Sequence, residues 1–186
     1  KRTRNAEVIA PLPGETLESF FKGVTDLLDT KVGRIQCHTL TMIYGTDYKD
    51  NEQFLNEHEY VTKFRIVVRN FTSIEGKPIL DVEEVAIATK DMSFSDYLKM
   101  RKYMFVIELC VNCGVFEPLL RYLESHGIKC SEWIQFIYKN LDKLPETIRE
   151  IFNSFEMETQ DELWDSEKAL VEHYSKPENY RLLIEG

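Results

Sequence analysis

The stretch Glu7-Val-Ile-Ala-Pro-Leu-Pro-Gly-Glu-Thr16 decides how the first half of the chain is expected to fold. Its apolar beginning predicts a short strand. The segment from Pro11 to Gly14 predicts a tight turn, because proline fixes φ and glycine reaches backbone angles closed to other residues. Thr16 is expected to cap a helix that follows. Strand, turn and helix N-terminus together can present backbone N–H groups to a ligand, although many α/β proteins contain this connection without such a role.

The residues after Thr16 predict a βαβ unit. Apolar side chains recur on one helical face between residues 17 and 28, and charged side chains occupy the other face. This pattern indicates a helix that lies over a sheet and ends before Gly33. A second strand is expected from Arg34 to about Met42, followed by a glycine turn. Strand, helix and strand in this order favour parallel pairing.

The middle of the chain predicts two more strands. Residues 60–69 and 79–89 are rich in β-branched and apolar residues and flank a turn at residues 76–78. Glu83 and Glu84 are adjacent acidic residues in the second of these strands. Adjacent residues of a strand point to opposite faces, so the two carboxylates cannot act together on one substrate atom. The two glutamates are expected to be solvated, or one of them to pair with an arginine such as Arg65 or Arg69.

The pattern changes to helices at Ser93, which forms a capping pair with Asp96. Residues 97–111 are apolar almost all round, so their helix should be central to the second half. The segment Thr159-Gln-Asp-Glu162 matches a capping box ahead of a further helix. We therefore expect an α+β chain with strands in residues 1–92 and a helical region in residues 93–186.

Composition excludes several classes of protein. The chain has 186 residues, of which 43% are hydrophobic and 12% aromatic, so it can bury a sizeable core and is not mainly disordered. The formal net charge of −9 argues against nonspecific binding to nucleic acid or to an anionic membrane. Neither a membrane span nor a signal peptide is visible, so a reducing cytoplasm is the expected location for the four cysteines.

The opening stretch also resembles a known family. Its letters resemble the Glu-(Leu/Val)-Ile-x-x-Leu-Pro-Gly-Glu-Thr segment of radical S-adenosylmethionine enzymes, especially the type that carries a cobalamin-binding domain. Residues 35–47 resemble the sixth strand of that family and the Pro-Gly-Thr loop after it, with Tyr44 in place of the usual proline. Residues 63–69 and 81–93 resemble the region after the barrel core. The resemblance fades in the helical second half.

The resemblance implies a fold and a cofactor site. Residues 1–92 would be the C-terminal part of the radical S-adenosylmethionine barrel, a βαβ remnant of a partial (β/α) barrel with extra strands. The end of the fifth strand would approach the adenine of S-adenosylmethionine, and the sixth strand would line the same mouth. The cofactor-binding residues implied in this way are Ile9, Pro11, Leu12, Gly14, His38 and Leu40. The alternative is that these residues serve only packing and turn formation.

One departure from the family limits the prediction. The Cys-x-x-x-Cys-x-x-Cys motif that holds the iron–sulfur cluster is absent, since the cysteines stand at positions 37, 110, 113 and 130. We therefore expect a fragment of a larger enzyme, and the rest of that polypeptide as its partner. The parent would use S-adenosylmethionine, a 4Fe-4S cluster and cobalamin on a small-molecule or unknown substrate. The isolated fragment is expected to be inactive, with no catalytic residues and no bound cofactor.

Two alternatives come from other classes of protein. Cys110, Cys113, His126 and Cys130 have the spacing of a zinc finger, but their place at the end of an apolar helix and the nearby Gly127 favour buried thiols over a metal site. The region after Ser93 could instead be a helical protein-interaction or regulatory module without catalysis.

The first strand should have an open edge if its upstream neighbour is missing. We expect this edge to be covered by self-association or by the apolar tail at residues 180–184.

Overall fold

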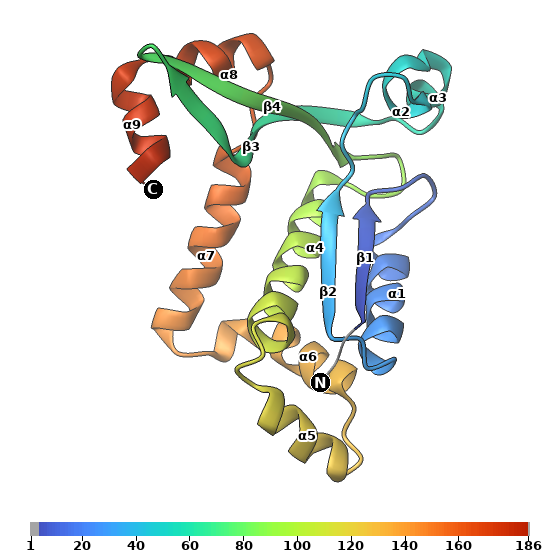
Figure 1. Cartoon of the computed structure of the whole chain (residues 1–186). Helices are drawn as coiled ribbons and strands as arrows, with labels where there is room; N and C mark the ends of the chain where they lie inside the picture. The colour runs from blue at the N-terminus through green and yellow to red at the C-terminus, as the bar shows by residue number, and fades with distance from the viewer. Residues whose placement is uncertain (1–3, 186) are drawn as a thin grey trace.

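The structure is a computed structural model that describes residues 4–185, without the side chains of Val68, Arg69 and Glu185. It is an α+β fold of two small strand pairs and a mostly helical second half, and the strand pairs do not close a barrel in the described part (Figure 1). The elements are β1 (Asn5–Ala10), α1 (Leu17–Asp29), β2 (Arg34–Thr39), α2 (Asp47–Asp50), α3 (Glu52–Glu57), β3 (Val61–Ile74), β4 (Lys77–Ala88), α4 (Phe94–Ile107), α5 (Glu117–Ser125), α6 (Cys130–Lys139), α7 (Glu146–Asp161), α8 (Glu167–Tyr174) and α9 (Pro177–Glu185).

The predicted βαβ unit is confirmed. β1 and β2 pair in parallel, with Val8 opposite Cys37 and Ile9 opposite His38. The crossover helix α1 buries Phe20, Val24 and Leu28, as its apolar spacing predicts, in a core that it shares with β2, α4 and α6. Thr16 caps α1, because its side-chain oxygen accepts a hydrogen bond of 3.1 Å from the Ser19 N–H.

The predicted strand pair in the middle of the chain is an antiparallel hairpin. β3 and β4 are joined at Glu75 and Gly76, which both have positive φ. The hairpin reaches the end of β2, because the Ala86 N–H donates to the Leu40 carbonyl and the Met42 N–H donates to the Glu84 carbonyl, each at 2.8 Å. The chain after β2 thus folds back antiparallel across the strand ends, instead of adding a further parallel strand.

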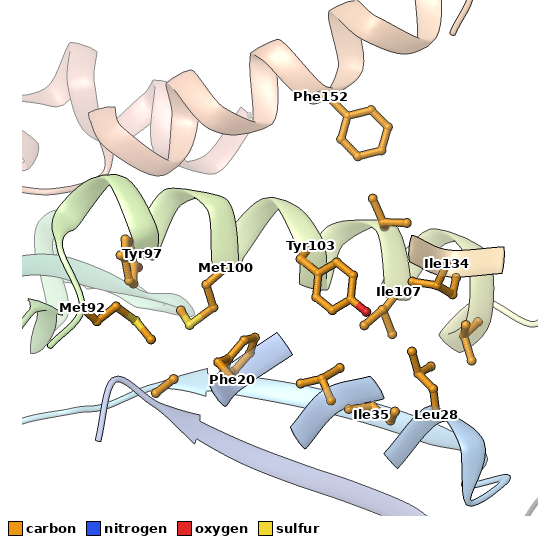
Figure 2. Close-up of a cluster of buried hydrophobic side chains, with 14 of the residues drawn as sticks. Phe20, Leu28, Ile35, Met92, Tyr97, Met100, Tyr103, Ile107, Ile134 and Phe152 are labelled. Carbon is orange, nitrogen blue, oxygen red and sulfur yellow. The ribbon is translucent and has the colours of Figure 1, made fainter. Parts of the chain in front are cut away.

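Helix α4 is the centre of the core, as its nearly continuous apolar surface predicts. Tyr97, Met100, Tyr103 and Ile107 are buried between the βαβ unit on one side and α6 and α7 on the other (Figure 2). Ser93 and Asp96 form the predicted capping box at its N-terminus. One buried cluster therefore contains side chains from both the strand-containing half and the helical half.

The predicted capping box at Thr159 is wrong. Thr159 does not cap a new helix: it lies buried inside α7, where its hydroxyl donates to the Phe155 carbonyl at 2.7 Å. The next helix, α8, begins after Ser166, whose side chain accepts from the Ala169 N–H.

The apolar tail does not cover β1. It forms α9, which lies beside the hairpin with the ring of Tyr180 6.3 Å from that of Phe71 (Figure 1). In the described part of the chain, no single helix is long and apolar enough to cross a membrane. Only the two helical segments 94–112 and 117–125 taken together have the length and apolar composition of a membrane span, and they are bent by 88° relative to each other.

Candidate functional site

The turn after β1 has the predicted form. Its Glu15 N–H donates to the Leu12 carbonyl at 3.1 Å, and Gly14 has φ of 75°, a conformation that favours glycine. The Leu12 N–H in turn lies 3.4 Å from the Glu15 carboxylate. Burial raises the pKa of Glu15 while the Leu12 N–H opposes the rise. The turn therefore holds a half-buried carboxyl group at the carboxyl end of β1.

Ile9 and His38 lie side by side on the sheet face that the helices leave uncovered. They are opposite each other in the parallel register, and both side chains are about half exposed, at 49% for Ile9 and 54% for the His38 side chain. The His38 Nε2 lies 3.9 Å from Glu7, the next residue on that face. This face therefore presents an apolar group, an imidazole and a carboxylate close to the carboxyl ends of both strands.

The other four residues implied by the family resemblance divide into two kinds. Gly14 and Leu12 are exposed in the turn, whereas Pro11 and Leu40 are buried. The Tyr60 hydroxyl donates to the Pro11 carbonyl at 3.4 Å. Leu40 packs with Met42 and Ala86, which the hairpin brings over the strand ends. Pro11 and Leu40 thus contribute packing, and their side chains are not open to a ligand.

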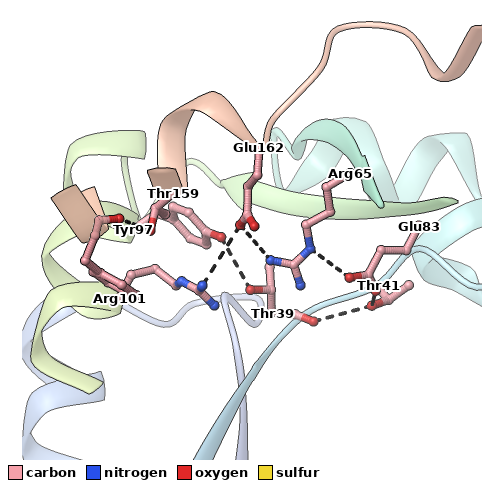
Figure 3. Close-up of polar contacts among 9 residues, drawn as sticks. Thr39, Thr41, Arg65, Glu83, Tyr97, Arg101, Thr159 and Glu162 are labelled. Atoms are coloured by element: carbon pink, nitrogen blue, oxygen red, sulfur yellow. Dashed lines mark hydrogen bonds and ion pairs between the residues drawn. The ribbon is translucent and has the colours of Figure 1, made fainter. Parts of the chain in front are cut away.

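A buried polar cluster lies where the hairpin, β2, α4 and the end of α7 meet (Figure 3). Arg65 is its centre: its Nε is 2.7 Å from Glu83 and its Nη1 is 3.0 Å from Glu162. Glu83 also accepts a 3.0 Å hydrogen bond from Thr41, the second residue after β2. The nearby carboxylates raise the pKa of Arg65 against an opposing effect of burial, so its charge persists.

The sequence predicted part of this cluster. Glu83 pairs with Arg65, and the side chain of Arg69 lies outside the described part. Glu84 points to the other face, where it binds Lys49 and accepts from Thr62, so the two glutamates are separated as predicted. Glu162 was missed because it lies 97 residues from Arg65 in a segment predicted to be a helix cap.

The zinc-type spacing does not produce a metal site. The described residues contain no group of three or more His, Cys, Asp or Glu side chains placed to hold a metal ion. Cys113 is exposed, Cys110 and Cys130 are half-buried thiols, and the His126 Nδ1 lies 2.9 Å from the Tyr122 carbonyl. Burial raises the pKa of Cys110 to about 11.

Comparison with known proteins identifies no relative: the chain matches no protein-family model, and no curated protein is detectably similar to it in sequence.

Proposed function

We propose that the chain is the C-terminal part of a radical S-adenosylmethionine enzyme, of the type associated with a cobalamin-binding domain. The observation that carries this proposal is the uncovered face of β1 and β2, where Ile9 and His38 are cross-strand neighbours beside the glycine turn. In barrels of parallel strands and helices, ligands bind at the carboxyl ends of the strands. Here that end combines the family-like letters of residues 7–16 with an exposed, mixed apolar and polar surface.

In this proposal, the described residues bind and orient the cofactor without performing its chemistry. Ile9 and Leu12 supply apolar surface for the adenine, and the turn at Gly14 leaves room for close approach. His38 supplies a hydrogen-bonding imidazole beside Glu7. The reductive cleavage of S-adenosylmethionine belongs to an iron–sulfur cluster held elsewhere in the parent polypeptide, since the cysteines described here do not assemble. By itself the chain is then inactive.

The open edge of β1 is a surface to which a further strand could pair. β1 pairs only with β2 in the described sheet, so its second edge is left with unpaired backbone groups. We infer that the preceding part of the parent polypeptide pairs with this edge. When that part is missing, the same edge would drive self-association of the fragment.

The proposed function is tested in the complete natural polypeptide. The protein is purified without oxygen, reconstituted with iron and sulfide, and reduced with dithionite in the presence of S-adenosylmethionine, and 5′-deoxyadenosine is quantified. We expect cleavage, and we expect Ile9→Arg to weaken cofactor binding by about tenfold or more because a charge replaces apolar contact. Lys22→Arg, on the exposed face of α1, is the matched control. Absence of a cluster and of 5′-deoxyadenosine would refute the proposal.

A second candidate function is a protein-interaction module, favoured by an exposed apolar patch around α5. The members of this α5 patch are Val115, Phe116, Leu119, Tyr122 and Ile128. The patch lies at the end of the molecule away from the hairpin (Figure 1). Beside it, Arg121 pairs with Glu117 at 2.6 Å, so both signs of charge flank the patch. We infer that a second copy of the chain docks here, with the same apolar patch contributed by both copies about a two-fold axis.

Light scattering tests the second candidate. The wild-type chain is expected to form a dimer that Tyr122→Glu disrupts, because the substitution puts a charge into the apolar contact. Tyr44→Glu, at an even more exposed tyrosine outside the α5 patch, should leave the dimer intact. A wild-type chain that stays monomeric at about 100 µM would exclude this interface as a stable one.

A further inference from the structure

A cavity of about 230 Å³ lies at the free edge of β2, between that strand, α4 and α7. We call it the β2-edge cavity. The residues that line it and enter the argument are Cys37, Arg101, Met104, Phe105, Glu108 and Phe155. The side chains of Ile35 and Cys37 line it from the opposite face of β2 to His38, and Gln36 lines it at the strand edge. The inference is therefore independent of the proposed function.

The backbone at this edge has an unsatisfied position. The Leu40 N–H donates to the Ala10 carbonyl at 2.9 Å, so the even-numbered residues of β2 face β1 and the odd-numbered residues face away. At Ile35, the side-chain amide of Asn112 makes the two hydrogen bonds that a neighbouring strand would make. It accepts from the Ile35 N–H at 3.0 Å and donates to the Ile35 carbonyl at 2.7 Å. At Cys37, the next outward-facing residue, the described residues offer no such partner, and the edge opens into the cavity.

Arg101 brings an incompletely paired guanidinium to the same cavity. Its nearest carboxylate is Glu162, at 4.0 Å from Nη2 (Figure 3), and its Nε is buried without a hydrogen-bond partner in the described part of the chain. Its guanidinium carbon lies 5.8 Å from the centre of the Phe155 ring. A guanidinium has five N–H donors, and a buried donor without a partner destabilises the protein. The Nε has almost no accessible surface, so a ligand in the cavity would instead reach the Nη groups, whose contact with Glu162 is long.

The remaining walls restrict the ligand further. The rings of Phe105 and Phe155 stack at 4.2 Å and, with Met104, form an apolar wall. Burial raises the pKa of Cys37 to about 12, so its thiol is neutral and does not repel an anion. Glu108, at the rim of the cavity, hydrogen-bonds to Asn112 at 2.6 Å and pairs with Arg34 at 3.4 Å, so its negative charge is already partly balanced.

We propose that the β2-edge cavity binds a small carboxylate with an adjacent N–H donor, the chemistry of an apolar α-amino acid. The ligand carboxylate accepts hydrogen bonds from Arg101, its ammonium group donates to the Cys37 carbonyl, and its side chain lies against Phe105 and Phe155. The cavity volume of about 230 Å³ lies below the range of about 300–1,000 Å³ for pockets that bind drug-sized molecules, so a ligand smaller than these is expected.

Calorimetric titration with L-phenylalanine tests this proposal, with phenethylamine as a probe that lacks only the carboxylate. We expect L-phenylalanine to bind and phenethylamine to bind at least about tenfold more weakly, because a charge-assisted hydrogen bond is lost. Arg101→Gln should reduce the affinity for L-phenylalanine by a similar factor. The matched control is Arg121→Gln, which removes an exposed arginine on α5 and should leave the affinity unchanged.

Arg101 also faces Glu162, so its substitution can disturb the fold. A second measurement therefore uses the wild-type chain. In nitrogen-15 NMR spectra, L-phenylalanine should shift the backbone amide signal of Cys37 and leave that of Cys113 in place. No binding at about 10 mM L-phenylalanine, equal affinity for phenethylamine, or unchanged affinity in Arg101→Gln would each overturn the proposal.

Discussion

Replacing Arg65 by Met is the substitution that most directly probes how the helical half is attached to the strands. The Arg65 side chain is only 13% exposed and holds Glu83 from the hairpin and Glu162 from the segment after α7. Removing it leaves two carboxylates without their shared cation. Breaking a fully buried ion pair costs about 3–5 kcal/mol. Because Glu83 and Glu162 are 21% and 31% exposed, water relieves part of this penalty, and we expect a loss of about 2–3 kcal/mol.

Urea unfolding followed by tryptophan fluorescence measures this loss. Trp164 is a suitable reporter, because its backbone pairs with Phe64 of the hairpin at 2.8 Å, one residue from Arg65. The control is Lys22→Met, which breaks an exposed pair with Asp26 and should cost less than about 0.5 kcal/mol.

A triple variant distinguishes an unpaired-charge penalty from lost packing. Arg65→Met combined with Glu83→Gln and Glu162→Gln removes all three charges, so it should be more stable than Arg65→Met alone. The reasoning is refuted if Arg65→Met unfolds within about 0.5 kcal/mol of the wild type, or if the triple variant is the less stable of the two.

Three further predictions concern separate parts of the fold. Iodoacetamide should label the exposed Cys113 well before Cys37, whose pKa burial raises to about 12; peptide mass spectrometry gives the order, and equal rates would contradict it. Ser93→Ala should cost about 1 kcal/mol in urea unfolding at pH 7. Hydrogen bonds from Ser93 and Lys99 lower the pKa of Asp96. The stabilisation by this cap is therefore present above about pH 4 and is lost as the pH falls through the lowered pKa. A stability difference between Ser93→Ala and the wild type that grew in acid would contradict this prediction. Met100→Ala should cost about 2–5 kcal/mol by the same assay, because Met100 is fully buried in the core, and a cost below about 1 kcal/mol would count against the core assignment.

The parts of the fold that the sequence predicts well are those set by neighbouring residues. The spacing of Phe20, Val24 and Leu28, the cap at Thr16 and the glycine turn are local patterns, and each has the expected structure. The proximity of Ile9 and His38 follows from parallel pairing of two strands that end at one edge.

The rest depends on contacts between distant segments. Burial of Leu40 could not be predicted, because it results from the hairpin folding back over the end of β2. Glu162 meets Arg65 only after α7 crosses the molecule. Thr159 carries the letters of a capping box, yet a threonine inside a helix satisfies its hydroxyl equally well with the carbonyl four residues earlier, and here that alternative prevails.

The function rests on whether this chain continues a cluster-binding barrel. The most direct test is to determine the sequence of the natural polypeptide upstream of Lys1. We predict a Cys-x-x-x-Cys-x-x-Cys motif within one barrel length of that residue. A natural chain that starts near Lys1, or an upstream region without the motif, would contradict the enzymatic proposal.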